Sequence, residues 1–138
     1  MKTLAIEKVQ SCRHYGTMDF VISGRSLLKE IERREYDYIP RLGSDFSPTD
    51  IGLREELLLE KTGYLSSGRV ALYICKCGDY ECGVISTKIF REGNHIIWSD
   101  FGYENECDKE FLLFDRIGPF RFEEKKYRQI VLDINKSD

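Results

Sequence analysis

Long apolar runs are absent from this sequence, and so are the compositions of the special protein classes. The longest uninterrupted apolar run covers residues 70–75, far short of the ~18 residues that a membrane-spanning helix needs. Eleven Gly and three Pro are too few for a collagen-like or low-complexity chain. A hydrophobic share of 41% is too high for a disordered one. These absences leave a soluble globular protein as the expectation.

Catalytic signatures are equally scarce. The only histidines are His14 and His95, and neither lies in a recognisable catalytic setting. The sequence contains no dinucleotide-binding glycine fingerprint, no P-loop, no H-E-x-x-H and no G-x-S-x-G. We interpret His95, which adjoins an apolar stretch, as a strand-end residue. The sequence therefore favours a protein without enzymatic activity.

A basic surplus is missing too. Lys and Arg total 21 against 24 Asp and Glu, which gives a net charge of −3 and a pI near 5.5. The basic stretches at 29–35 and 123–126 contain acidic residues as well, as solvated helix faces do. Because nucleic-acid binding depends on neutralising phosphates, we expect no nucleic-acid partner. Residues 1–8 lack the apolar core and cleavage site of a secretory signal, which predicts a cytoplasmic protein with reduced thiols.

The 138 residues predict a single domain over 1–138, since one hydrophobic core commonly serves roughly 100–150 residues. Alternating apolar residues around Leu4–Ile6 and Met18–Ile22 predict an N-terminal hairpin. Residues 25–35 have the spacing of a short amphipathic helix. Residues 52–60 fit either a helix or a strand, because Gly52 and three consecutive leucines leave the period undecided.

The second half of the chain has clearer patterns. The apolar run over 69–75 is typical of a strand covered on both faces. The stretches 83–91 and 95–101 are rich in β-formers, and the Gly93-Asn94 turn between them predicts an antiparallel hairpin. These segments form a predicted meander over 69–101. A helix over 123–134 follows from one apolar stripe at helical spacing, formed by Tyr127, Ile130, Val131 and Ile134. The predicted fold class is α+β with a mainly antiparallel sheet.

Three cysteines stand close together in the turn between two predicted strands: Cys75, Cys77 and Cys82. Thiolates from a Gly-containing turn are typical ligands of structural zinc, but a closed tetrahedral site needs a fourth ligand. The pattern C-x-C-x4-C also lacks the paired C-x2-C spacing of strong zinc signatures. Buried free thiols, zinc ligation and redox chemistry all remain open.

The predicted meander ranks the candidates for a fourth ligand. The end of its first strand, the start of its second and the end of its third all lie at the same end of the sheet. Cys107, which comes after the third strand, would therefore lie beside the cysteine turn. His95 would begin the third strand about 20 Å away at ~3.3 Å per residue. Cys107 is therefore favoured over His95, with Cys12 and His14 as a second option. The same reasoning places five loop carboxylates at this end of the sheet. They form either an acidic rim or two solvated loops: Asp79, Glu81, Glu104, Glu106 and Asp108.

Three short segments occur in this order: the C-x-C-G-x3-C turn at 75–82, W-S-D-F at 98–101 and G-P-F-x-F at 118–122. A predicted helix that contains Tyr127 follows them. Together they resemble a family of small uncharacterised bacterial proteins over roughly the C-terminal half. The resemblance implies a bacterial cytoplasmic protein and lends no catalytic residue and no substrate. Such relatives can have a His shortly after W-S-D-F, where this chain has Asn105 and then Cys107.

Two functions remain. The first is a non-enzymatic protein-binding module of adaptor or immunity type, which binds another protein at the end of the sheet that carries the cysteine turn. The alternative is a zinc-binding or thiol-dependent protein that uses Cys75, Cys77 and Cys82, with zinc as the cofactor and Cys107 as the fourth ligand.

Overall fold

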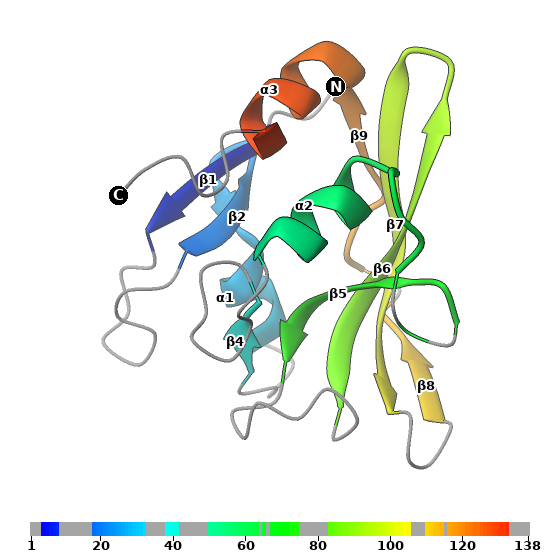
Figure 1. Ribbon diagram of the computed structural model, residues 1–138. Helices are drawn as coiled ribbons and strands as arrows, with labels where there is room; N and C mark the ends of the chain where they lie inside the picture. Colours follow the sequence, from blue (N-terminus) through cyan, green and yellow to red (C-terminus); the bar gives the residue numbers. More distant parts are fainter. Residues whose placement is uncertain are drawn as a thin grey trace.

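The computed structural model describes residues 4–8, 18–32, 38–41, 50–63, 65, 67–74, 83–105, 110–114 and 116–132 (Figure 1). Helices and two antiparallel sheets occur along the chain, which confirms the α+β class. None of the described helices has the length and apolar character that crossing a bilayer requires.

The first sheet contains the predicted N-terminal hairpin. Strand β1 (Leu4–Lys8) pairs antiparallel with β2 (Met18–Ile22), and β2 pairs with the two-residue strand β3 (Arg25–Ser26). Helix α1 (Leu27–Glu32) follows directly, inside the predicted range 25–35, and residues 33–35 lie outside the described part. The Ser26 hydroxyl accepts a hydrogen bond from the Lys29 amide, which is how an N-cap residue satisfies the first turn of a helix.

The second sheet contains the predicted meander and is larger than the prediction. Strands β5 (Val70–Ile74), β6 (Val84–Glu92) and β7 (His95–Asn105) are antiparallel neighbours. On the outer side of β5 lies β4 (Ile39–Pro40). The outer side of β7 is shared, because β9 (Phe120–Glu123) pairs with its first half and β8 (Glu110–Leu113) with its second half.

A β-bulge in β7 determines which residues face the core. Ser86 pairs with Gly102 and Lys88 pairs with Ser99, so β7 has one more residue than β6 in this stretch, and Asp100 has a φ of 53°. An extra residue reverses the alternation of side chains. Trp98 and Phe101, three residues apart, are therefore both buried in one core.

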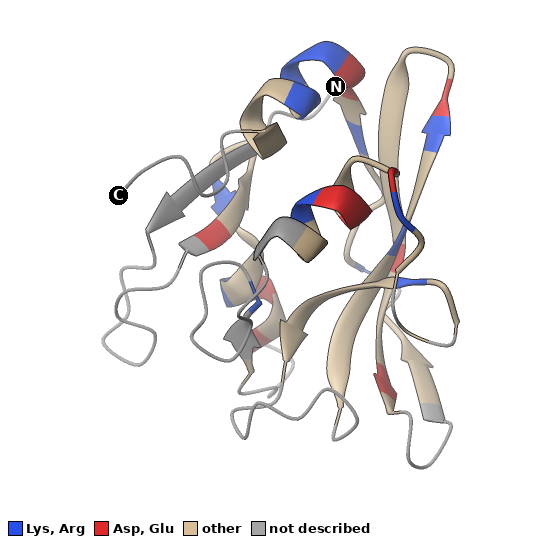
Figure 2. Cartoon of the chain, in the orientation of Figure 1, with Lys and Arg blue, Asp and Glu red and all other residues tan. Residues whose placement is uncertain are grey.

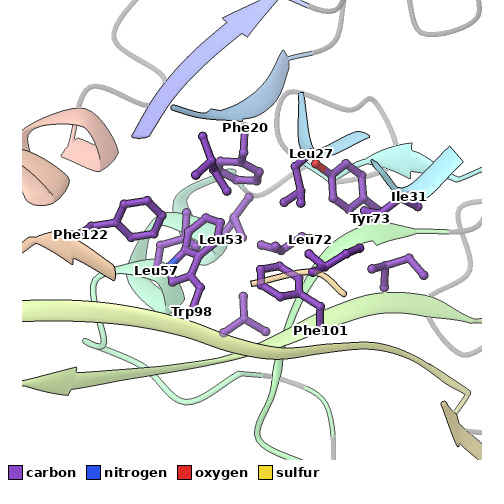
Figure 3. Close-up of a cluster of buried hydrophobic side chains, with 14 of the residues drawn as sticks. Phe20, Leu27, Ile31, Leu53, Leu57, Leu72, Tyr73, Trp98, Phe101 and Phe122 are labelled. Carbon is purple, nitrogen blue, oxygen red and sulfur yellow. The ribbon is translucent and has the colours of Figure 1, made fainter. Parts of the chain in front are cut away.

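That core lies between the sheets and the helices (Figure 3). Trp98 is at its centre, with the rings of Phe20 and Phe122 each 5.3 Å away, centre to centre, in edge-to-face contact. Its indole N–H donates to the Tyr127 hydroxyl, which donates to the Leu57 carbonyl oxygen at 2.6 Å. Burial raises the pKa of Tyr127, so this hydroxyl keeps its proton. This series of hydrogen bonds joins β7 to helix α3 (Glu124–Leu132) and helix α2 (Asp50–Leu57) through buried groups.

The two remaining helices cover this core. Helix α2 (Asp50–Leu57) resolves the ambiguity over 52–60 as a helix followed by a turn, with Leu53 and Leu57 fully buried. Helix α3 (Glu124–Leu132) confirms the predicted C-terminal helix. Tyr127 and Val131 of its stripe are buried and Ile130 is half-buried, whereas Ile134 lies outside the described residues.

Candidate functional site

The predicted metal ligands Cys75, Cys77, Cys82 and Cys107, and the second option Cys12 and His14, lie outside the described residues. The four-cysteine site therefore stays a prediction. Within the described part of the chain, no group of three or more His, Cys, Asp or Glu side chains is placed to hold a metal ion.

The strands that flank the cysteine turn have the register on which the prediction depends. Ile74 pairs with Val84, and Val84 pairs with Glu104, so the end of β5, the start of β6 and the end of β7 lie side by side. His95 pairs with Glu92 at the other end of the hairpin, where the Arg121 guanidinium lies 3.2 Å from its Nδ1 atom. The structure thus separates His95 from the end of the sheet where 75–82 begins.

Glu104 corrects the interpretation of an acidic rim. Its side chain is buried, and it accepts hydrogen bonds from the hydroxyls of Ser86 and Ser67. The Arg69 Nε atom lies 3.1 Å from a Glu104 oxygen. A carboxylate with an ion-pair partner and two hydroxyl donors is part of the folded framework, so it is not a free charge on a solvated loop. The other carboxylates of that prediction lie outside the described residues.

Arg69 connects this carboxylate to the bulge in β7 and to β8. Its guanidinium donates to the backbone oxygens of Ser86 and Asp100, and it lies 4.6 Å from the centre of the Phe111 ring. Desolvation lowers the pKa of Arg69, while the negative charges of Glu104 and Asp100 raise it. The Phe111 ring also lies over Gly102, where an added Cβ would be 2.8 Å from a ring carbon. The Phe111 ring thus packs against the Arg69 guanidinium and the backbone of Gly102.

Strand β8 exposes three consecutive large apolar side chains. The exposed fractions are 46% for Phe111, 54% for Leu112 and 51% for Leu113. None of these three residues carries a charge, and Figure 2 draws this part of β8 in tan. We call these three residues the β8 edge. Sequence reasoning missed this feature, although the run of four apolar residues at 111–114 was a signal for a strand.

The backbone of the β8 edge has groups that point away from β7. The Phe114 amide donates to the Phe101 carbonyl oxygen at 2.7 Å, which makes these two a hydrogen-bonded pair in the register of β7 and β8. Bonding directions alternate along an antiparallel strand, so Leu112 bonds toward β7 while Phe111 and Leu113 direct their N–H and C=O groups outward. Among the described strands, none pairs with that outer side.

Two further buried polar groups hold elements together. Asp19 accepts hydrogen bonds from the hydroxyls of Ser26 and Tyr73 and from the amides of Phe20 and Leu28. These bonds join β2, the start of α1 and β5. Desolvation raises the pKa of Asp19, and the four bonds partly offset it.

The second group is the buried ion pair between Arg41 and Glu56, at 2.7 Å. Arg41 also donates through its side chain to the Ala71 carbonyl oxygen and through its backbone to that of Leu72. These bonds attach the chain after β4 to α2 and β5. Both buried groups are accounted for by the fold, whereas the exposed apolar surface of the β8 edge is not explained by contacts within the described residues.

No protein-family model, no curated protein and no solved structure matches this chain.

Proposed function

We propose that this chain is a non-enzymatic protein-binding module, and that its partner adds an extended segment to the β8 edge as a further strand. The observation that carries the proposal is the combination of three half-exposed apolar side chains with outward backbone groups on one strand. Strand addition uses both features, since the backbone supplies hydrogen bonds and the side chains supply specificity.

The composition of β8 supports an accessible edge. Natural proteins protect edge strands by keeping them very short, as β8 is, or with charged residues such as Lys, with Pro, with a bulge or with a covering loop. Glu110–Leu113 contains no Lys and no Pro, and its register with β7 is regular. Full burial of one large apolar side chain contributes about 1.5–3 kcal/mol. Covering the exposed half of three such side chains would therefore contribute roughly 2–4 kcal/mol.

Site-specific photocrosslinking tests this proposal. A photoreactive phenylalanine analogue replaces Leu113 in one variant and Leu132 in a control variant, because Leu132 is an apolar residue of α3 with 38% of its surface exposed. After irradiation in cells that express the chain, we expect discrete protein adducts from position 113 and none from position 132. Equal adducts from both positions, or none from position 113, would contradict the proposal. Mass spectrometry of the adduct identifies the partner.

The alternative function is zinc binding or thiol chemistry at Cys75, Cys77 and Cys82, with Cys107 as the fourth ligand. It is supported by the register of Ile74, Val84 and Glu104, since segments 75–82 and 106–109 continue from the same end of the sheet. Thiolate ligands at zinc lie at about 2.3 Å and resist thiol reagents until the metal is removed.

Elemental analysis of the purified protein, combined with thiol titration before and after chelation, tests the alternative. We expect about one zinc per chain and masked thiols if the four cysteines form a closed site. Freely reactive thiols without bound metal would exclude zinc ligation and leave the protein-binding proposal unaffected.

A further inference from the structure

We propose that Ser67 is a phosphorylation site, and that a phosphate on its hydroxyl takes Arg69 away from Glu104. The enzyme is a serine/threonine kinase that transfers the γ-phosphoryl group of ATP. The bond from the γ-phosphorus to ADP breaks, a bond to the Ser67 Oγ atom forms, and the hydroxyl proton passes to a carboxylate of the kinase. This inference goes beyond the proposed function and does not depend on it.

Ser67 has the exposure that a kinase substrate needs. Among the described serines and threonines, Ser23, Thr62 and Ser67 are exposed, and the others are half-buried or buried. Ser67 lies in the connection between α2 and β5 (Figure 1). There the Gly68 amide closes a turn by donating to the Leu65 carbonyl oxygen at 2.8 Å. Connecting segments at the surface are where proteins commonly carry functional residues.

The Ser67 hydroxyl is in direct contact with an ion pair. It donates to one oxygen of the Glu104 carboxylate at 2.8 Å. The Arg69 Nε atom lies 3.1 Å from the other oxygen of that carboxylate. The Ser67 oxygen also accepts a hydrogen bond from the Arg69 amide at 3.3 Å. A group added to this hydroxyl is therefore next to an anion and a cation at once.

A phosphate turns the contact with Glu104 from attraction into repulsion. The oxygen of the phosphate ester carries no proton, so the hydrogen bond that Ser67 donates to the carboxylate is lost. The phosphate adds about −1.5 to −2 charge at pH 7 beside a buried carboxylate, and like charges repel. The Arg69 guanidinium is within reach, because it already contacts the same carboxylate. Guanidinium and phosphate form strong, often bidentate, hydrogen bonds, so we expect Arg69 to exchange partners.

Arg69 transmits this change to the bulge in β7 and to β8. Its guanidinium donates to the backbone oxygens of Ser86 and Asp100 and lies 4.6 Å from the centre of the Phe111 ring. Movement of the guanidinium to the phosphate breaks these contacts. Among the described residues, Glu104 then keeps the Ser86 hydroxyl as its remaining donor. The modification therefore weakens the pairing between the second half of β7 and β8.

Mass spectrometry of the chain isolated from its native cells, with phosphatase inhibitors present during lysis, tests whether the site is used. We expect a species with one added phosphoryl group, which fragmentation places on Ser67 and phosphatase removes. The Ser67→Ala chain, expressed in the same cells, should lack this species. A phosphoryl group on a different residue, or an unmodified chain in growing, stationary and stressed cells, would overturn the site.

Hydrogen exchange of a chain with phosphoserine at position 67 tests the exchange of partners. We expect the amides of β8 and of the second half of β7 to exchange about tenfold faster than in the unmodified chain, because local opening becomes easier. The matched control has phosphoserine at position 23, the exposed serine in the turn between β2 and β3. It should exchange like the unmodified chain in β7 and β8. Equal exchange in the two phosphorylated chains would overturn the mechanism.

Glu104→Gln separates the charge of this side chain from its hydrogen bonds. Glutamine keeps the shape and an acceptor oxygen but carries no charge, so a phosphate beside it meets no anion. The increase in exchange caused by phosphoserine at position 67 should therefore be at least about threefold smaller in this variant, as expected for coupled groups. Circular dichroism verifies that the variant folds. An equal increase with and without the Glu104 charge would show that the ion pair is not involved and would overturn the mechanism.

These tests are independent of the protein-binding proposal. Photocrosslinking at position 113 uses the unmodified chain, so an unphosphorylated Ser67 leaves its result unchanged.

Discussion

At the scale of single residues, the bond between Tyr73 and Asp19 can be isolated by removing one hydroxyl group. Both side chains are buried, and their oxygens lie 2.6 Å apart. We expect Tyr73→Phe to lower the free energy of unfolding at neutral pH by about 1.5–3 kcal/mol, the usual range for a hydrogen bond to a charged group. Urea denaturation measures the loss.

Tyr103→Phe is the control for this variant. The Tyr103 hydroxyl is only partly buried and accepts a hydrogen bond from the neutral Asn105 side chain. We expect a cost below about 1.5 kcal/mol. A larger loss from Tyr103→Phe than from Tyr73→Phe would show that the buried carboxylate contributes less than its surroundings suggest.

The same bond predicts a pH dependence. Desolvation raises the pKa of Asp19 above its usual 3.8, and the Tyr73 hydroxyl acts in the opposite direction by stabilising the ionised form. A carboxyl group whose pKa is higher in the folded than in the unfolded state stabilises the folded state when it is protonated. This contribution is complete below the pKa of the unfolded state and is lost as the pH rises through the pKa of the folded state.

Tyr73→Phe should therefore cost most when Asp19 is ionised and less when it is protonated. We expect the difference in unfolding free energy between wild type and variant to narrow as pH falls through the raised pKa of Asp19 toward 3.8. A difference that widens on acidification, measured by urea denaturation at several pH values, would contradict the assigned bond.

Sequence reasoning is weakest for polar residues at this scale. Glu104 has the sequence neighbours of a solvated loop, yet it lies at the end of β7 and is neutralised by Arg69. That pairing joins residues 35 positions apart (104 − 69), and no local pattern encodes it.

At the scale of elements, the stripe of α3 contains two residues whose burial differs. Val131 is fully buried, whereas the adjacent Ile130 is only half-buried against the same core. We expect Val131→Ala to cost about 2 kcal/mol, from two lost carbon groups and a cavity. Ile130→Ala removes more atoms but should cost only about 1 kcal/mol, because its surroundings include water.

Alanine is the best helix former, so both substitutions on α3 report packing and not a loss of helix propensity. Chemical denaturation of the two variants gives the comparison. A greater loss for Ile130→Ala would mean that the helix is rotated about its axis relative to the structure.

Elements with strong periodicity could be predicted, and elements that depend on partners could not. The N-terminal hairpin, the meander and α3 follow from alternation, a Gly-Asn turn and a helical stripe. Helix α2 remained ambiguous because Gly52 and the leucines after it do not fix a period. Strand β8 has only four residues and no alternation of apolar and polar side chains, so the short apolar run at 111–114 was its one signal.

At the scale of the whole molecule, residues from the two sheets and all three described helices contribute to one core. The ring of Trp98, from the second sheet, is in contact with the ring of Phe20, from the first sheet, and with the ring of Tyr127, from α3. Within the described residues the two sheets therefore share one core, and the single domain over 1–138 stays a prediction. The shared core also explains why the bulge in β7 matters, since without it Phe101 would leave the core.

Trp98 makes the single-domain prediction measurable, because it is the only tryptophan in the chain and lies where the sheets and α3 meet. Unfolding of either sheet would expose it. We expect tryptophan fluorescence and far-UV circular dichroism to report one coincident transition in urea, as for a two-state domain. If the N-terminal sheet and the meander were separate domains, circular dichroism would change in two steps while the fluorescence followed only one of them. Coincident curves in the wild type and in Val131→Ala, displaced to lower urea in the variant, would show that α3 stabilises both sheets through the same core.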